Sequence, residues 1–276
     1  MTIQTVGIVG LGLMGGSLAR DLTAAGVRVV GHDRDRATMQ RALADGVVAA
    51  VVDGVAGLAA VEVVVLAVPV RTAATLLAAE GAGWTRVRLV TDLGSTKESI
   101  GRAATVAGLG ERFVGSHPLA GDHRSGYGAS GEGMYRGAQV IVCPGAAGDA
   151  AIDAVHELWA LVGGLPLVVH GSDHDRMMAL RSHLPQLVSS ALGALLGRRD
   201  VPHSELGPGG QDMTRLAGSS PEMWTDIVMD NGELIAGALR DLGNVLGDLI
   251  GAVEAGDEAR VAALLEEARA WHRGTA

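Results

Sequence analysis

The first 170 residues alternate short apolar runs with segments of helical periodicity. Each run is apolar throughout, which is typical of strands buried on both faces of a sheet. Strands that alternate with helices favour a parallel sheet covered by helices on both sides. We therefore predict an α/β fold with a doubly wound sheet whose strands lie at residues 6–9, 27–30, 61–68, 89–93, 113–117, 138–143 and 165–170.

From Ser172 onward the apolar period becomes helical. Ser220 followed by Pro221 is typical of a helix start, because proline fits the first helical position. Apolar residues then recur over about seven or eight turns, which predicts one long helix, and a last helix carries Val261 to Ala268. We predict an all-helical second domain at residues 171–276, after a first domain at residues 1–170.

The predicted long helix carries a wider apolar face than a small helical domain can cover. A homodimer formed through this second domain would cover that face, and a long buried helix within a monomer is the alternative. We therefore expect an all-helical dimerisation domain.

The first apolar run leads into a glycine-rich turn with Gly10, Gly12 and Gly15. In this spacing the first glycine permits a tight turn, the second leaves room for phosphates, and the third lets a helix pack on the strand. A second run is followed by Asp33. The whole arrangement is typical of a Rossmann-type domain. It predicts that a dinucleotide is bound by Gly10, Gly12, Leu13, Met14, Gly15 and Asp33; a glycine turn without a ligand is the alternative.

Asp33 bears on the choice of dinucleotide. A carboxylate at the end of the second strand accepts hydrogen bonds from the adenosine ribose and repels a 2′-phosphate. Arg34 and Arg36 stand beside it and can instead pair with such a phosphate, while Asp35 has the position of a helix cap. The sequence favours NAD and leaves NADP open.

The composition limits the kinds of molecule that this protein is expected to bind. The chain has 276 residues, of which 48% are hydrophobic, and a formal net charge of −9, which argues against nucleic acid or an anionic membrane as partner. Its one cysteine, Cys143, ends an apolar run and forms no internal disulfide, which fits a reducing compartment. The N-terminus enters the first strand without a signal peptide, and no apolar stretch has membrane-spanning length. We expect a cytoplasmic protein with a small-molecule substrate.

Two polar sequences follow predicted strands, at the edge where open α/β sheets bind ligands. In the first, Ser95 and Glu98 have the spacing of a capping box, which predicts that Ser95 begins a helix and faces the crevice. Lys97 beside them is either a phosphate or substrate contact or a solvated charge. In the second, His117 ends a buried strand just before Pro118. A structural histidine is the alternative to a catalytic one.

At this point the residues resemble the prephenate dehydrogenase family. The resemblance covers nearly the whole chain and is carried by the glycine turn, Asp92–Lys97, Ser116–Gly121, His174–Asp175, Ser182–Pro185, Thr214–Ala217 and Ser220–Trp224. It implies a Rossmann domain, a helical dimerisation domain and NAD(P)-dependent oxidative decarboxylation of prephenate or arogenate for tyrosine synthesis. One stretch departs from the family's pattern: Gly121-Asp-His-Arg-Ser-Gly126 stands where many members have Gly-Thr-Glu-Lys-Ser-Gly. The departure leaves substrate preference and tyrosine feedback open.

The resemblance also implies roles for single residues. His117 matches the catalytic base, a role that suits a neutral imidazole, and Ser95 would hydrogen-bond the substrate hydroxyl or His117. Arg215 matches an arginine that binds a carboxylate, and His183 a histidine that contacts substrate. Pro185 leaves the Arg181 carbonyl unpaired, so we expect a kink that turns His183 toward the crevice.

Three further polar residues lie near these positions in the sequence. Arg176 lies about two turns before His183, so both can share a face. His174 and Asp175 are interpreted as structural residues of a helix start. No metal is required, because aromatisation drives the loss of carbon dioxide.

The predicted function is therefore NAD-dependent oxidative decarboxylation of prephenate to 4-hydroxyphenylpyruvate. The nearest alternative is the same chemistry on arogenate, which gives tyrosine directly. A β-hydroxyacid dehydrogenase would need a lysine in the helical domain, which has none. A non-catalytic NAD-binding regulator is a more remote alternative, because it needs neither two histidines nor an opposing arginine.

Overall fold

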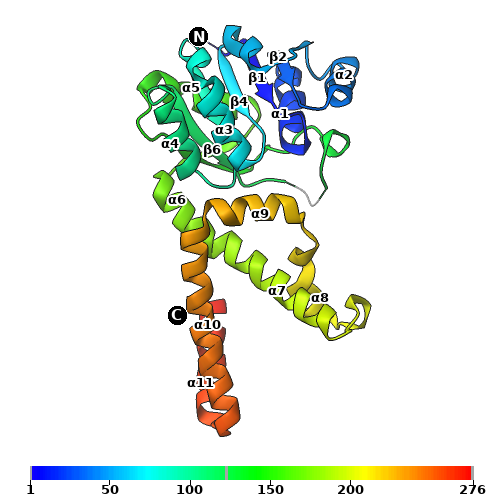
Figure 1. The fold of residues 1–276 in the computed structure, drawn as a ribbon, viewed down its shortest axis with the longest axis vertical. Helices are drawn as coiled ribbons and strands as arrows, with labels where there is room; N and C mark the ends of the chain where they lie inside the picture. The colour runs from blue at the N-terminus through cyan, green and yellow to red at the C-terminus, as the bar shows by residue number, and fades with distance from the viewer. Residues whose placement is uncertain (1, 122–123, 275–276) are drawn as a thin grey trace.

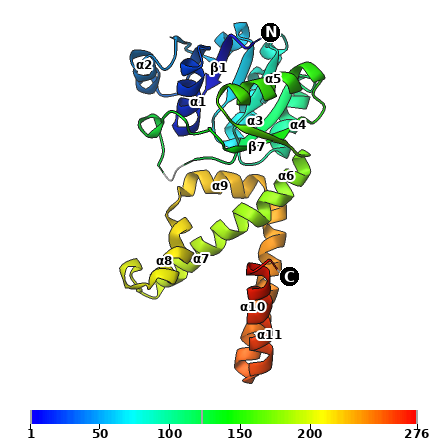
Figure 2. The same cartoon turned by 180° about the vertical axis from the view of Figure 1, so that it is seen from behind.

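The computed structural model describes residues 2–121 and 124–274. An α/β domain carries the N-terminal half of the chain, and helical arms project from it (Figures 1 and 2). The connection between them is α6 (Gly171–Met178), which begins directly below the sheet.

Eight strands form one sheet in the order β3-β2-β1-β4-β5-β6-β7-β8. The order reverses between β1 and β4, which makes the switch point where such sheets bind ligands at the carboxyl ends of the strands. The strands are β1 (Thr5–Val9), β2 (Arg28–His32), β3 (Ala50–Val51), β4 (Val63–Leu66), β5 (Leu89–Asp92), β6 (Phe113–Pro118), β7 (Gln139–Cys143) and β8 (Leu165–Val168).

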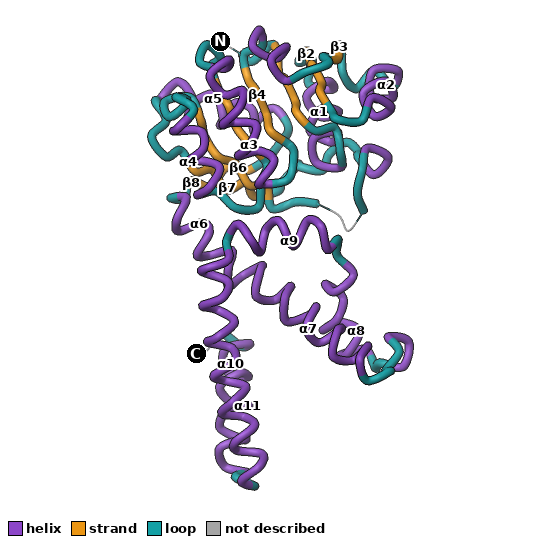
Figure 3. The backbone as a smooth tube through the Cα atoms, in the orientation of Figure 1, coloured by secondary structure: helices purple, strands orange, loops and turns teal. Residues whose placement is uncertain are grey.

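Alternate residues of the central strands enter two separate cores. In β4, Val63 and Val65 join one core while Val64 and Leu66 join the other, as the two-residue period of a strand requires. The first core includes residues of α1 (Leu13–Ala24), α2 (Arg36–Ala44) and α5 (Asp149–Leu161). The second includes residues of α3 (Val70–Glu80), α4 (Glu98–Val106) and the short turns Val55–Ala60 and Gly81–Trp84. The predicted doubly wound fold is confirmed (Figure 3).

Two strands differ from the predicted parallel, fully buried pattern. β7 runs antiparallel to β6, with Gly115 opposite Cys143. A parallel pair needs a long crossover, usually a helix, but only the one-turn helix Tyr127–Ala129 is described between these strands. β8 lies at the edge of the sheet, where the side chains of Leu165, Leu167 and Val168 are 59%, 44% and 53% exposed.

The helical part begins with α6, passes through a π-helical turn at Ala179–His183, and continues as α7 (Leu184–Arg198). The one-turn helix His203–Glu205 and α8 (Pro208–Thr214) follow at the far end of α7, and the 3₁₀ turn Arg215–Gly218 packs back on α7. Then α9 (Pro221–Asp230) crosses beneath the sheet, and α10 (Gly232–Ala255) and α11 (Glu258–His272) form a projecting antiparallel pair (Figure 1).

The prediction of a single long helix from Pro221 onward is wrong, because the helix is interrupted at Asn231. Ser220 caps the helix start as expected, by accepting a hydrogen bond from the Met223 amide. The backbone of Asn231 is not helical, with φ −105° and ψ 28°. Its side chain donates a hydrogen bond to the Asp175 carbonyl in α6. The following Gly232 begins a new helix in a different direction.

The projecting pair exposes a band of apolar side chains. On α10 the exposed fractions are 53% for Val245, 49% for Leu246, 57% for Ile250 and 63% for Val253. Such a band on a helix that projects from the molecule is typical of an interaction surface. Over the described residues, no helix combines the length and the apolar character needed to cross a membrane.

Candidate active site

The glycine-rich turn has the shape that a dinucleotide needs. Gly10 has φ +92°, and a Cβ there would collide with the Ala67 carbonyl, while one at Gly15 would collide with the Gly10 carbonyl. Gly12 differs: among the described residues nothing lies within 4 Å of the place of its Cβ. Gly12 precedes α1, whose first amides have no side-chain cap in the described structure. The helix N-terminus is therefore free to receive a phosphate.

Asp33 directly follows β2 and braces this turn. Its Oδ2 accepts a hydrogen bond from the Leu11 amide at 2.7 Å, and its Oδ1 accepts one from the Asp35 amide at 2.8 Å. Asp35 caps α2, as its sequence position suggested. Arg36, a candidate partner of a 2′-phosphate, pairs with Asp53 at 3.1 Å. Asp33 thus has a structural task besides its predicted contact with a ribose.

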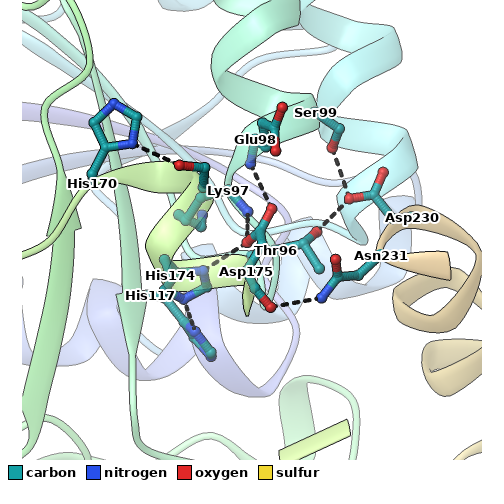
Figure 4. A network of polar contacts seen from close by, with 12 residues as sticks. Thr96, Lys97, Glu98, Ser99, His117, His170, His174, Asp175, Asp230 and Asn231 are labelled. Atoms are coloured by element: carbon teal, nitrogen blue, oxygen red, sulfur yellow. Dashed lines mark hydrogen bonds and ion pairs between the residues drawn. The ribbon is translucent and has the colours of Figure 1, made fainter. Parts of the chain in front are cut away.

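At the carboxyl end of β6, a chain of hydrogen bonds begins at His117 (Figure 4). The Nδ1 atom of His117 lies 2.8 Å from Nε2 of His174, and Nδ1 of His174 lies 2.7 Å from Oδ1 of Asp175. His174 is fully buried, whereas His117 is half-buried. The three side chains join the sheet to the first turn of α6.

Asp175 also caps α4, which corrects the predicted capping box. Its Oδ1 accepts a hydrogen bond from the Lys97 amide at 2.8 Å and its Oδ2 one from the Glu98 amide at 2.9 Å. The helix begins at Glu98, with no cap from a side chain of its own segment. Ser95 precedes it, half-buried. The Asp175 carboxylate of α6 thus accepts hydrogen bonds from the first amides of α4. Its negative charge also interacts favourably with the dipole of that helix.

The surroundings of His117 favour a neutral imidazole. Burial, together with the nearby His174, Lys97 and His183, holds the pKa of His117 well below 6.5. Burial alone would raise the pKa of Asp175, but hydrogen bonds from His174 and from the amides of Glu98 and Lys97 outweigh it and lower that pKa. His117 is therefore neutral, and the Asp175 carboxylate, at the other end of the same chain of hydrogen bonds, is ionised.

Lys97 is not a solvated charge, so that sequence interpretation is wrong, while its contact with a phosphate or substrate stays a prediction. Its side chain is 1% exposed and forms an ion pair with Asp92. Its Nζ also donates to the Ser116 carbonyl at 2.8 Å. The Ser116 hydroxyl lies 2.9 Å from Thr91 Oγ1 and accepts from Trp159 Nε1 at 3.0 Å. This buried network fixes the residue before His117.

His183 lies at the end of the π-helical turn, just before Pro185. The predicted kink is therefore a π-turn. His183 is 1% exposed; its Nδ1 lies 3.3 Å from Asn231 Nδ2, and its ring meets Trp224 edge-on at 5.9 Å. Burial lowers the pKa of His183 to about 4. Arg176 does not share this position, since it pairs with Asp173 on the exposed surface.

Arg215 is exposed and lines a groove of about 710 Å³ between α7 and α8, together with Leu196, Gly197 and His203. The next residue, Leu216, accepts a hydrogen bond through its carbonyl from Gln186 Nε2 at 2.7 Å, and Gln186 lies three residues after His183 on α7. Among the described residues, no hydrogen bond or ion pair joins Arg215 to His117, His174 or His183. The predicted binding of a carboxylate by Arg215, opposite the predicted base, stays a prediction.

Comparison with known proteins identifies the family of this chain. The family model of the prephenate dehydrogenase nucleotide-binding domain matches residues 18–167, and that of the prephenate dehydrogenase dimerization domain matches residues 170–267. The chain belongs to the prephenate dehydrogenase family. The resemblance seen in the sequence motifs is confirmed.

Members of the prephenate dehydrogenase family resemble this chain over most of its length. Prephenate dehydrogenase of Bacillus subtilis is 33% identical over 249 residues, which are 84% of this chain and 65% of that protein. Cyclohexadienyl dehydrogenase of Zymomonas mobilis is 32% identical over 84% of this chain and 82% of that protein. A crystal structure of prephenate dehydrogenase from A. aeolicus, in complex with hydroxyphenyl propionate and NAD+, has a TM-score of 0.88 at 29% identity, covering 100% of this chain and 99% of that one. The chain thus spans slightly less than two thirds of the Bacillus relative.

The stretch that departs from the family pattern, Gly121–Gly126, follows β6 and precedes the turn at Tyr127. Asp122 and His123 lie outside the described residues. Substrate preference and tyrosine feedback therefore stay open at this loop.

Three residues of the site were missed or undervalued in the sequence. His174 and Asp175 were interpreted as residues of a helix start, and Asn231 was placed inside a helix. Adjacent polar residues that open a helix are common, so their local pattern carries no signal for the hydrogen bonds to His117 and to α4. What points to a role for His174 and Asp175 in the sequence is that they stand, in order, among the family's motifs.

Proposed function

We propose that this protein catalyses NAD-dependent oxidative decarboxylation of prephenate to 4-hydroxyphenylpyruvate. The observation that carries the proposal is the neutral His117 at the carboxyl end of β6, on the same edge as the open N-terminus of α1. β6 lies three strands from β1, or about 14 Å across the sheet. A dinucleotide whose pyrophosphate lies at Gly12 can extend along this edge to His117.

The residues present fit NAD. Gly12 leaves space at an uncapped helix start, and Asp33 places negative charge where an adenosine ribose would lie. The A. aeolicus relative is described with NAD+ bound. Gly10, Gly12, Leu13, Met14, Gly15 and Asp33 would hold the cofactor, and bound NAD supplies the acceptor for a hydride.

The chain's own residues then handle the proton. Neutral His117 accepts the proton of the substrate's ring hydroxyl while the carbinol carbon is oxidised. Ser95, half-buried before α4, donates a hydrogen bond to the same oxygen. The resulting dienone loses its ring carboxylate as carbon dioxide, because the product is aromatic. No acid or metal is needed for that loss.

Prephenate carries two carboxylates, so cations must bind it. Lys97, the cation beside His117, is neutralised by Asp92. We assign carboxylate binding to Arg215, which is exposed and lines the groove between α7 and α8, and we propose that it acts on the site of a second copy of the chain. The family description of residues 170–267 as a dimerization domain and the exposed apolar band on α10 support a homodimer. His183 completes the substrate site from the π-turn.

Mixed dimers test this assignment. His117→Asn and Arg215→Ala each remove one function, so each homodimer should be nearly inactive at low substrate concentration. If Arg215 acts on the partner's site, mixing the two variants restores up to about a quarter of the wild-type activity. Mixed dimers that stay as inactive as the parent homodimers would place Arg215 in the site of its own chain.

A second candidate is arogenate, because a relative named cyclohexadienyl dehydrogenase matches as well as the Bacillus prephenate dehydrogenase does. Initial rates of NADH formation with prephenate and with arogenate, measured side by side, decide between them. His117→Asn keeps a hydrogen-bonding group but no base, so it should lower kcat by roughly 10²–10⁴ with little change in KM. Turnover of neither substrate by the wild type, or near-normal turnover by the variant, would refute the proposal.

The remaining assignments concern context. The reaction belongs to tyrosine biosynthesis, and we place it in the cytoplasm because the buried Cys143 has no disulfide partner. NADP stays open as a second cofactor.

A further inference from the structure

We propose that His174 and Asp175 are positioning residues that fix His117 in one tautomer, with its proton on Nδ1 and a free lone pair on Nε2. The idea rests on the proposed role of His117 as base and extends it. It follows from three hydrogen bonds in series and from the number of protons that each partner can hold.

The series begins at the Asp175 carboxylate, which can only accept hydrogen bonds here. It faces two backbone N–H groups, those of Lys97 at 2.8 Å and Glu98 at 2.9 Å, and an N–H group can only donate. His174 Nδ1 approaches the same carboxylate at 2.7 Å. Donors at both oxygens hold the carboxyl group ionised, and its pKa is lowered despite burial.

An ionised carboxylate determines the proton of His174. The ring nitrogen that faces Asp175 must carry the N–H, so His174 has its proton on Nδ1. We propose that His174 is neutral as well; a neutral imidazole has one N–H only, so Nε2 of His174 accepts a hydrogen bond. His174 is fully buried, so water does not compete for this nitrogen.

The proton of His117 follows in turn. Its Nδ1 lies 2.8 Å from Nε2 of His174, and this contact needs one proton, which only His117 can supply. Nε2 of His117 is then unprotonated and can accept the proton of a substrate hydroxyl. The opposite tautomer would present an N–H to the substrate and leave two lone pairs in contact.

The same series accommodates the proton once it is taken. When Nε2 of His117 accepts a proton, the ring carries a positive charge beside Lys97 and His183, which disfavour it. Transfer of the Nδ1 proton to Nε2 of His174 moves that charge to a ring hydrogen-bonded to Asp175. One N–H bond breaks and one forms, and no further reactant is needed.

Nitrogen-15 NMR of the histidine rings tests the proposal without substrate. The chain has nine histidines, and comparison with His117→Asn assigns the signals of His117. In the wild type above pH 7, we expect the Nδ1–H form for both His117 and His174. An Nε2–H form of His117 in the wild type would overturn the proposal, even if Asp175 variants failed to fold.

Asp175→Ala is the matching variant. It removes the acceptor of the His174 Nδ1–H group, so a proton on that nitrogen no longer has its buried partner. Both rings should then switch to the Nε2–H form, and kcat should fall by a factor on the order of 10³ with KM little changed. Asp173→Ala removes an equal charge from the exposed surface of the same helix and should change neither tautomer nor kcat.

The outcomes separate two roles of Asp175. If Asp175→Ala loses activity while His117 keeps its wild-type tautomer, Asp175 acts only as the cap of α4, and the proposal is wrong. If the tautomers behave as expected but neither prephenate nor arogenate is turned over, the tautomer series stands and the proposed function fails.

Discussion

At the scale of single residues, the site works by keeping charge off a histidine. His117 is surrounded by Lys97, His174 and His183, and burial adds to their effect, so its pKa lies well below 6.5. The only nearby lysine is held by Asp92 and the Ser116 carbonyl. His117 therefore keeps its lone pair at pH values where an exposed histidine is largely protonated.

The pH dependence of kcat/KM should reflect this environment. Protonation removes the base, so activity falls as the pH falls through the lowered pKa of His117. We expect kcat/KM to stay level from pH 7 to about 6 and to decline only below the ordinary histidine value. Steady-state rates in buffers of constant ionic strength measure it, and an acid limb at or above pH 6.5 would contradict this effect of burial and neighbouring charge.

Asp33 should select NAD over NADP. Its carboxylate braces the glycine turn through the Leu11 amide and would also lie close to a 2′-phosphate. Asp33→Ser keeps a hydrogen-bonding group and removes the charge, so the ratio of kcat/KM for NAD to that for NADP should fall roughly tenfold, or about 1.4 kcal/mol. Asp153→Ser, at an exposed position of α5, is the control. Equal or better use of NADP by the wild type would assign cofactor choice to Arg34 or Arg36.

At the scale of elements, the junction of α6, α9 and α10 ties the helical part to the sheet. Asn231, between α9 and α10, donates to the Asp175 carbonyl at 2.9 Å and contacts His183. Asp230 beside it accepts hydrogen bonds from Thr96 at 2.6 Å and Ser99 at 2.8 Å, at the start of α4 (Figure 4). The break between the two helices is therefore part of the site's framework.

Asn231→Ala should destabilise the protein by about 1–3 kcal/mol, because it leaves buried polar groups without a partner. Alanine also favours a continuous helix through the break, which would displace Asp230 from α4. Urea unfolding followed by circular dichroism measures the change. Asn244→Ala, at an exposed position of α10, should have an effect of less than about 0.5 kcal/mol. Equal stability of the two variants would show that the Asn231 contacts carry no net stabilisation.

At the scale of the whole molecule, the projecting helix pair leaves a band of apolar side chains exposed. The apolar band on α10 includes Leu246 and Ile250, which are about half exposed and lie one turn apart. Asp248 lies on another side of the same helix and pairs with Arg260 of α11. The proposed role of Arg215 in the site of another copy requires such a dimer.

Light scattering should therefore show a dimer at micromolar concentration. The double variant Leu246→Asp, Ile250→Asp places charges in the band and should be monomeric, with KM for prephenate raised because Arg215 of the second copy is lost. Asp248→Ala, on the side of α10 that faces α11, should remain dimeric. A wild-type monomer, or a double variant that still dimerises, would exclude this face as the interface.

The sequence by itself determined the features that depend on short spacing. The strand, glycine turn, helix and acid of the dinucleotide site span about thirty residues, and their steric requirements are visible in residue types: Gly10 and Gly15 are needed where a Cβ would collide with backbone. The doubly wound sheet follows from the alternation of apolar runs with helical periods. His117 was predicted because a polar residue at the end of a buried strand faces the crevice.

Only the tertiary structure decided which distant groups meet. Asp175 caps α4 across 77 residues and orders the tautomers of two histidines, and no local pattern records that contact. The antiparallel direction of β7 depends on a connection that lacks a crossover helix among the described residues. The interruption of the helix at Asn231 depends on the hydrogen-bond partners of Asn231 in α6 and in the π-turn. Side-chain hydrogen bonds between distant elements are set by packing, so a sequence shows the donors and acceptors without showing their partners.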